Sequence, residues 1–393
     1  MVKKRLLFLT PRFPYPPLSG GKLVLLHVAE ALRDYELTLL SMCGAQEEME
    51  YEPNDGIFAK IHKVYLPKLA SYWNALSSLP GGRPLQLAYY RSNAFRCKVE
   101  ELLPQHDAVV AHLIRAGQYI ADSDRKIPSA LLMSDAISLA YQRFANLPGT
   151  SLLWRFLSRT ELNRLFRYER SCPESFDLVW LHSETDRRFL ELKQKSVRLF
   201  PLGVDLNEFP FNPAPSGNVV AFVGNMSFSL NIDACRHFIR DIFPALRTRA
   251  GLRFRVIGAC PPSIRRELEK HAGVEVTGAV RHIADAVDGI FCGVCPVRAG
   301  AGIQSKILNY LALGIPCVTS DVGLEGLNAV DGRDLLVYRK PENAVDMILK
   351  LHGDSSLRNT LAENGRRYVE KAHDWKTIHA SIREDVQELL VIK

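Results

Sequence analysis

The sequence lacks the long apolar run that a membrane-spanning helix requires. Among its 393 residues, no apolar stretch approaches the roughly 20 residues needed to cross a bilayer. The N-terminus starts with basic residues as a secretory signal does, but its apolar run is short, and Pro11, Pro14, Pro16 and Pro17 follow without a small-residue cleavage site. We therefore expect residues 5–10 to form a buried first strand and the protein to stay in the cytoplasm.

The cysteines lack the spacing of a disulfide framework or a zinc site. Eight are scattered from Cys43 to Cys317, and only Cys292 and Cys295 form a CxxC pair. A structural zinc ion needs four ligands, and neither a second pair nor a nearby histidine pair supplies the other two. The CxxC pair lies inside an apolar run, so we expect both thiols in the core, where cysteine behaves as a small hydrophobic residue.

A large excess of one charge is also missing. The net charge of +7, from 50 Lys and Arg against 43 Asp and Glu, is compatible with an anionic ligand or membrane surface but requires neither. No basic block is interleaved with aromatic residues, so we do not expect nucleic-acid binding. The chain is globular in composition, and its length favours two domains of about 200 residues each.

Short apolar runs alternate with helical patterns along the whole chain, which is typical of α/β domains with mostly parallel sheets. A proline-containing segment at 204–217 separates two such series. We predict a doubly wound N-terminal domain over 1–203, a second one over 218–373, and a last helix within 374–393 that packs back towards the first domain. Ligands of doubly wound sheets bind at the carboxyl ends of the strands.

The most informative segment is 296–320. An apolar run, Gly289–Cys295, is followed by a loop of Arg298 and small residues, and then by a helical pattern that stops at Gly314. Free amide groups and the helix dipole favour an anion where such a loop enters a helix. Lys306 adds a second cation, so we expect a phosphorylated ligand of about the size of a nucleoside diphosphate.

This segment resembles the donor site of the retaining nucleotide-sugar glycosyltransferases of GT-B fold, the group 1 glycosyl transferases. Further motifs occur in that family's usual order along nearly the whole chain, at residues 19–21, 182–186, 201–209, 222–226 and 323–327. The resemblance implies two Rossmann-like domains that face each other across a cleft. It also implies transfer of a sugar, with retention, from a nucleotide sugar to a cell-surface polysaccharide or glycolipid acceptor.

The resemblance assigns residues to the site. Two polar residues at strand ends are candidates for the reacting centre: His112, which would contact the donor sugar, and Asp135, which would bind a hydroxyl. The alternatives are a hydrogen-bonded histidine at a strand end and a helix cap. The donor-binding set comprises Gly20, Gly21, Gly224, Asn225, Arg298, Gly300, Ala301, Gly302, Lys306, Asn309 and Glu325.

The sequence departs from the family at two positions. The family usually has two glutamates eight residues apart, and here Ala301 and Asn309 stand in their places. Asn309 can still bind ribose, and the two cations can neutralise the departing phosphate without a carboxylate nucleophile. No DxD-type metal motif is apparent, so we expect transfer without a metal or cofactor. A catalytically silent nucleotide-sugar-binding or scaffold protein stays an alternative, and a nucleotide-sugar epimerase is a weaker one.

Two segments are candidates for peripheral contact with an anionic membrane at its inner face. In the resembled family, the region equivalent to 68–103 faces the acceptor or the membrane; an aromatic helical hairpin packed on the sheet is the alternative. Residues 151–172 carry five arginines. Their apolar positions form two groups that point to different sides at about 100° per residue, which favours a bent or broken helix. The aromatic residues of the first segment are Tyr72, Trp73, Tyr89, Tyr90 and Phe95.

Overall fold

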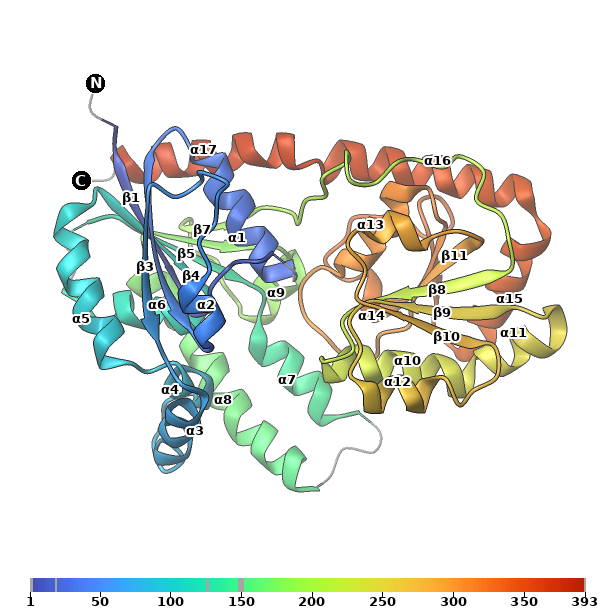
Figure 1. The fold of residues 1–393 in the computed structure, drawn as a ribbon, viewed down its shortest axis with the longest axis horizontal. Coiled ribbons are helices and arrows are strands. Elements are labelled where there is room, and N and C mark those ends of the chain that lie inside the picture. Colours follow the sequence, from blue (N-terminus) through green and yellow to red (C-terminus); the bar gives the residue numbers. More distant parts are fainter. Residues whose placement is uncertain (1–2, 18–19, 125–126, 148–151, 392–393) are drawn as a thin grey trace. The chain divides into compact units, whose positions relative to one another are not determined.

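The computed structural model describes residues 3–17, 20–124, 127–147 and 152–391 of the chain. The chain divides into two compact units, each described by itself below (Figure 1). The N-terminal unit comprises Met1–Ala145, Thr150–Phe200 and Lys376–Lys393, and the C-terminal unit comprises Pro201–Trp375 with Asn146–Gly149.

The described part of the N-terminal unit contains one seven-stranded parallel sheet of order β3-β2-β1-β4-β5-β6-β7. Its strands are β1 (Arg5–Thr10), β2 (Glu36–Cys43), β3 (Lys60–Tyr65), β4 (Ala108–His112), β5 (Ser129–Ser134), β6 (Leu178–Leu181) and β7 (Val197–Leu199). Its helices are α1 (Gly20–Ala31), α2 (Gln46–Glu50), α3 (Lys68–Ser77), α4 (Leu85–Tyr89), α5 (Asn93–Leu102), α6 (Leu113–Ala121), α7 (Ile137–Ala145), α8 (Leu152–Ser175) and α9 (Glu184–Phe189).

Burial explains why the central strands β1 and β4 are nearly uninterrupted apolar runs. Parallel sheets are covered by helices on both faces, so both side-chain rows of a central strand avoid water. In β1, each residue from Leu6 to Leu9 has no exposed surface. The expected buried first strand at residues 5–10 is therefore confirmed.

Helix α17 (Trp375–Val391) brings the end of the chain onto the N-terminal unit, which includes it from Lys376 onwards. Asp385 Oδ2 accepts a hydrogen bond of 2.7 Å from Trp180 Nε1 in β6. Glu388 forms an ion pair of 2.9 Å with Arg198 in β7. These two contacts fix the helix beside the last strands of the sheet.

Of the expected bent or broken helix at 151–172, the break is wrong, because Leu152–Ser175 is one continuous helix, α8. Two adjacent apolar residues in the described part of this helix are covered by different neighbours. Leu165 is fully buried, whereas the ring of the next residue, Phe166, packs on Phe189 in α9 at 5.5 Å. Pattern arguments that assume a single covering surface therefore fail for this helix.

The described part of the C-terminal unit contains one six-stranded parallel sheet of order β10-β9-β8-β11-β12-β13. Together with the first sheet, it confirms the predicted α/β class with two Rossmann-like units. Its strands are β8 (Val219–Val223), β9 (Arg253–Ile257), β10 (Val274–Gly278), β11 (Ile290–Cys295), β12 (Cys317–Ser320) and β13 (Leu336–Tyr338). Its helices are α10 (Ser229–Asp241), α11 (Phe243–Ala250), α12 (Pro262–Leu268), α13 (Ser305–Leu313), α14 (Asp321–Leu324), α15 (Pro341–Gly353) and α16 (Ser355–Ala372).

Tyr310 holds α13 against the centre of this sheet. Its hydroxyl accepts from Val223 N at 2.7 Å and lies 3.2 Å from Ala221 O, to which it donates. Its ring lies so close to Gly293 in β11 that a Cβ there would come within 2.5 Å of the ring. Glycine at 293 and tyrosine at 310 therefore set the position of α13 together.

The CxxC pair is part of this core. Cys292 and Cys295 both lie in β11 without exposed surface, and neither forms a disulfide. Burial raises the pKa of both thiols, which disfavours the thiolate that metal binding or redox chemistry needs. The expected core role of the pair is confirmed.

Candidate functional site

The predicted donor-binding residues of the C-terminal unit gather where its sheet changes direction. β8 and β11 are neighbours, and the strands that follow each of them lie on opposite sides. In doubly wound sheets, the carboxyl ends of such a strand pair form the ligand-binding crevice. Gly224 and Asn225 follow β8, and the loop 296–304 follows β11, so both segments reach this point.

The turn after β8 is closed by its own side chains. Asn225 Oδ1 accepts from Ser227 N at 2.8 Å, and Asn231 Nδ2 donates to the Asn225 carbonyl at 2.9 Å. A Cβ at Gly224 would approach the Phe222 ring to 2.9 Å, so a larger residue would disturb the turn. The turn leads into α10, whose N-cap residue, Phe228, provides no side-chain cap. Amide groups of its first turn are thus left for another acceptor.

The loop after β11 has the predicted form of strand, small-residue loop and helix N-terminus. Gly302 adopts a φ of 68°, in the left-handed region that favours glycine. Ser320 Oγ anchors the loop by donating to Val297 O at 2.6 Å. Gln304 is the N-cap residue of α13 and makes no side-chain cap, so α13 also presents free amide groups.

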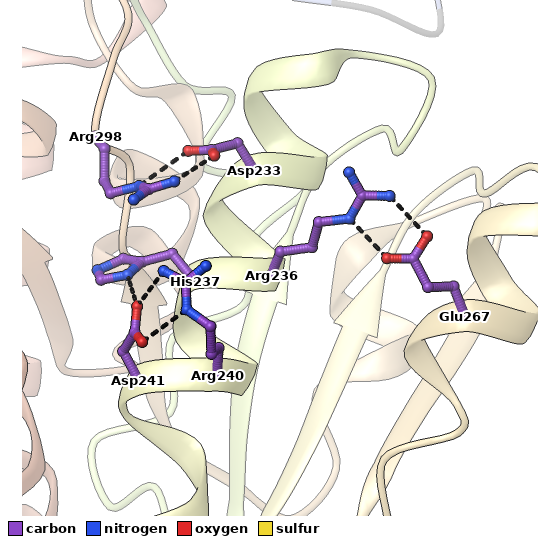
Figure 2. Close-up of polar contacts among 7 residues, drawn as sticks. All are labelled: Asp233, Arg236, His237, Arg240, Asp241, Glu267 and Arg298. Atoms are coloured by element: carbon purple, nitrogen blue, oxygen red, sulfur yellow. Dashed lines mark hydrogen bonds and ion pairs between the residues drawn. The ribbon is translucent and has the colours of Figure 1, made fainter. Parts of the chain in front are cut away.

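Arg298 is not the free cation that the sequence suggested. Its guanidinium binds Asp233 of α10 through two hydrogen bonds, Nε to Oδ2 at 3.1 Å and Nη2 to Oδ1 at 2.5 Å (Figure 2). Such a bidentate pair neutralises the arginine charge and ties the β11 loop to α10. A role for Arg298 in phosphate binding stays a prediction, and it would require Asp233 to share the guanidinium.

Lys306 is the cation of this site without a carboxylate partner among the described residues. It lies in the first turn of α13, and only 8% of its surface is exposed. Its Nζ donates to Gln304 Oε1 at 2.9 Å and lies 5.4 Å from the centre of the Phe222 ring. Both neighbours are neutral, and a buried charge without a counter-ion costs free energy. An anion beside Lys306 would offset that cost.

Three further residues were predicted to contact the donor: Asn309, Ala301 and Glu325. Asn309 lies three residues beyond Lys306 along α13 and is half-buried, and its side-chain amide makes no hydrogen bond to another described residue. Ala301 is half-buried in the loop, where its methyl group offers no polar contact. Glu325 is half-buried at the end of α14, the helix that follows β12. Their roles as ligand contacts stay predictions.

In the N-terminal unit, His112 ends β4 and is 5% exposed. Its Nδ1 lies 3.3 Å from Thr10 Oγ1 on β1, as the hydrogen-bonded alternative predicts, but Nε2 has no partner among the described residues. Burial, together with the charge of Arg115, lowers the pKa of His112 to about 3. The imidazole is therefore neutral near pH 7, so it can exchange hydrogen bonds but carries no charge.

Asp135 follows β5 and does not cap α7. The first amide groups of α7, Ile137 N and Ser138 N, donate instead to the Glu169 carboxylate of α8, at 2.7 and 3.2 Å. The helix-cap alternative for Asp135 is therefore wrong, because Glu169 already occupies that position. Burial raises the pKa of Asp135 to about 6. Its carboxyl group is available as a hydrogen-bonding group for a hydroxyl.

Gly20 and Gly21 begin α1 and are exposed. A Cβ at either position would meet no atom within 4 Å, so packing within the protein does not require glycine there. Close approach of the backbone to a ligand stays the predicted reason. Ser19 of the same motif lies outside the described residues.

The comparisons with known proteins agree with this geometry. Residues 217–354 match the family model of the group 1 glycosyl transferases. An uncharacterised 44.6 kDa protein from the cps region of Klebsiella pneumoniae is 20% identical over 381 residues, which cover 94% of this chain and 96% of that protein.

Solved structures share the fold at low sequence identity. Sucrose-phosphate synthase from Thermosynechococcus elongatus superposes with a TM-score of 0.77 and 14% identity over 100% of both chains. HepE from Anabaena has a TM-score of 0.69 and 16% identity over 98% of this chain and 99% of its own. Residues 217–354 therefore match the group 1 glycosyl transferases, and the chain has the GT-B fold of the solved structures that it resembles.

Proposed function

We propose that this glycosyltransferase moves a sugar from a nucleoside-diphosphate sugar to a saccharide or lipid-linked acceptor of a cell-surface polysaccharide, with retention and without a metal ion. The single observation that carries the donor assignment is Lys306. It is a nearly buried amine at an uncapped helix N-terminus, with neutral neighbours only. A diphosphate supplies the missing negative charge.

The chemistry needs little more than positioning and charge neutralisation. A nucleoside diphosphate is already a good leaving group, and negative charge develops on its phosphate oxygens as the sugar departs. Lys306 and the amide groups of α13 would stabilise that charge in a site where they are oriented before the reaction. Asn309 would bind ribose, and His112 and Asp135 would bind sugar hydroxyls.

Two relatives support the substrate classes. The HepE structures hold UDP and UDP-glucose, and the Klebsiella relative is encoded in a cps region. These properties belong to those proteins. For this chain they support a nucleotide sugar as donor and a polysaccharide precursor as acceptor.

The donor assignment is tested by calorimetric titration of the full chain with UDP-, GDP-, ADP- and dTDP-sugars. We expect saturable binding of one nucleotide class, without added divalent metal and unaffected by a chelator. Absence of binding for all four classes would contradict the proposal.

Peripheral membrane contact is the second part of the proposal, and it rests on α3. Leu69, Tyr72, Trp73 and Leu76 follow the spacing of one helix face and are 56–77% exposed. In Figure 1, α3 and α4 lie beside the arginine-rich α8, and Arg164 of α8 donates to Leu79 O at 2.8 Å. Apolar side chains next to basic ones are typical of surfaces that lie on anionic lipid. None of the helices within the described ranges is long and apolar enough to span a membrane.

A further inference from the structure

Three cations lie at the carboxyl ends of β1 and β4 in the N-terminal unit. Arg12 follows β1 by two residues, Lys22 is in the first turn of α1, and Arg115 is in the first turn of α6. β1 and β4 are the neighbours at which this sheet changes direction. The three cations therefore lie at the ligand-binding edge of a doubly wound sheet. We call them the cation cluster.

Tyr90 holds the two arginines of the cluster. Arg12 Nε donates to Tyr90 Oη at 2.7 Å, and the guanidinium carbons of Arg12 and Arg115 lie 5.8 and 5.5 Å from the ring centre. The tyrosine is 7% exposed, and its carbonyl accepts from Tyr119 Oη at 2.7 Å. Cation–π contact thus orients two like charges on one rigid ring.

The other contacts of the cluster are neutral. Arg115 Nε and Nη2 both donate to Gln86 Oε1, at 2.9 and 2.6 Å, and Gln86 Nε2 donates to Tyr141 Oη at 3.0 Å. Among the described residues, the Tyr15 carbonyl is the acceptor for Lys22 Nζ, at 3.5 Å. No carboxylate within the described parts of the chain forms an ion pair with any of the three cations.

Burial, and to a lesser extent repulsion, disfavours the charged form of two of these cations. Burial lowers the pKa of Lys22 and of Arg115, and the charge of Arg12 lowers each further. Glu48 and Glu169 act on Lys22 and Arg115 respectively in the opposite direction, without forming an ion pair. Burying these cations without an ion pair therefore costs free energy that a bound anion would offset.

Two buried histidines give an independent sign of a missing ligand. His112 and His182 are 5% and 8% exposed, and Nε2 of each has no partner in the described residues. Burial lowers the pKa of His182 to about 4, as it does that of His112, so both rings are neutral near pH 7. His112 ends β4 three residues before Arg115, and its Nδ1 lies 3.3 Å from Oγ1 of Thr10, two residues before Arg12, so the imidazole lies at the same strand ends as the cluster.

We propose that the cation cluster binds an anionic group of the acceptor, a carboxylate or a phosphate, so that this glycosyltransferase uses an acidic acceptor. This inference rests on the proposed sugar transfer. Guanidinium groups bind both anions through paired N–H donors, which suits Arg12 and Arg115. The donor diphosphate already has Lys306 and the α13 amides in the C-terminal unit, so the acceptor is the source of the anion that we assign here.

The test uses the full chain saturated with whichever of UDP, GDP, ADP and dTDP it binds, which fills the donor site. Ligand-observed NMR would compare methyl β-D-glucuronide and glucose 1-phosphate with the neutral methyl β-D-glucoside. We expect at least one charged probe to bind roughly tenfold more tightly than the glucoside, the scale of a charge-assisted hydrogen bond. Arg12→Gln and Arg115→Gln should each remove that preference. The control variant Arg33→Gln, which changes an exposed arginine of the same unit, should keep it.

Three outcomes would overturn the inference. Equal binding of charged and neutral probes would show that the cluster does not select an anion. A preference that persists in both Arg12→Gln and Arg115→Gln would place the anion elsewhere. Weaker binding of that nucleotide by Arg12→Gln would assign the cluster to the donor diphosphate. Failure of wild-type protein to bind any of the four nucleotides would instead contradict the proposed function, and the charge preference can still be measured without a nucleotide.

Discussion

At the scale of single residues, the site depends on which charges are already paired. Arg298 and Lys306 look equivalent in the sequence, but Asp233 neutralises the first and no described carboxylate neutralises the second. Asp233 lies 65 residues before Arg298. A local pattern cannot reveal such a partner, because only the fold brings α10 and the β11 loop together. The sequence therefore predicts the two cations and the loop after β11, but not the ion pair between Arg298 and Asp233.

The first prediction concerns this difference. Lys306→Ala should weaken binding of the donor nucleotide by about 1.5–3 kcal/mol, the scale of a hydrogen bond to a charged group. Lys350→Ala, an exposed lysine of α15 in the same unit, should leave the affinity unchanged. Calorimetric titration measures both variants. Unchanged affinity in a folded Lys306→Ala protein would remove Lys306 from the donor site.

Asn309 carries the second prediction. A ribose contact is made equally in the ground state and the transition state, so Asn309→Ala should raise the donor KM and leave kcat nearly constant. Asn309→Glu should keep or improve binding, because an ionised carboxylate accepts stronger hydrogen bonds. Steady-state kinetics at varied donor concentration measure the KM and kcat of both variants. A fall in kcat at constant KM would show that Asn309 acts on the reacting atoms and not on the ribose.

At the scale of secondary-structure elements, α7 and α8 depend on a buried carboxylate. Glu169 of α8 caps α7 by accepting from Ile137 N and Ser138 N, and the Ser138 hydroxyl also donates to it. Burial raises its pKa to about 7, the hydrogen bonds oppose that rise, and Asp186 adds to it. Glu169 comes more than 30 residues after the start of α7, so the sequence suggested the nearer Asp135 as the cap.

The third prediction follows from the raised pKa. The folded state binds the Glu169 proton more tightly than the unfolded state, so this contribution to stability is complete below about pH 4.5 and is lost as pH rises through about 7. Glu169→Gln should therefore flatten the fall in unfolding free energy between pH 5 and 8, by roughly 1–3 kcal/mol. Denaturant titrations across that pH range measure it. Parallel curves for wild type and variant would contradict the assignment.

Helix α3 carries the fourth prediction. Leu69→Ala and Trp73→Ala remove exposed apolar side chains, so the fold should be unaffected. Membrane insertion of each side chain contributes on the order of 1 kcal/mol or more, so the double variant should bind anionic vesicles at least about tenfold less. Flotation with phosphatidylglycerol vesicles measures this, with phosphatidylcholine vesicles as the neutral surface. Val330→Ala, exposed in the other unit, is the control.

Equal flotation of the Leu69→Ala/Trp73→Ala protein and the control would exclude α3 as a membrane contact. The sequence left open whether this aromatic region faces the acceptor or the membrane or packs on the sheet, and its aromatic residues differ in burial. Tyr90 and Phe95 are buried, whereas Tyr72 and Trp73 are exposed. Aromatic content alone does not distinguish these two environments.

At the scale of the whole molecule, the sequence predicts the two sheets well because their evidence is local. The apolar runs at residues 5–10 and 290–295 and the strand–loop–helix pattern at β11 and α13 need no distant partner to be recognised. The cation cluster shows the opposite case, because Arg12 and Tyr90 lie 78 residues apart and meet only in the folded unit. Local patterns therefore predict the framework, and long-range pairing determines which polar groups stay available to ligands.

The most direct test of the central claim is acceptor-dependent release of nucleoside diphosphate. Wild-type protein would be incubated with its tightest-binding nucleotide sugar and a panel of saccharide and lipid-linked acceptors, with Lys306→Ala as the matched variant and Lys350→Ala as the control. The account predicts release with at least one acceptor in the wild type and the control, and a rate at least about tenfold lower in Lys306→Ala. Clear donor binding without release for any acceptor would contradict it and would assign the chain to the catalytically silent, nucleotide-sugar-binding alternative.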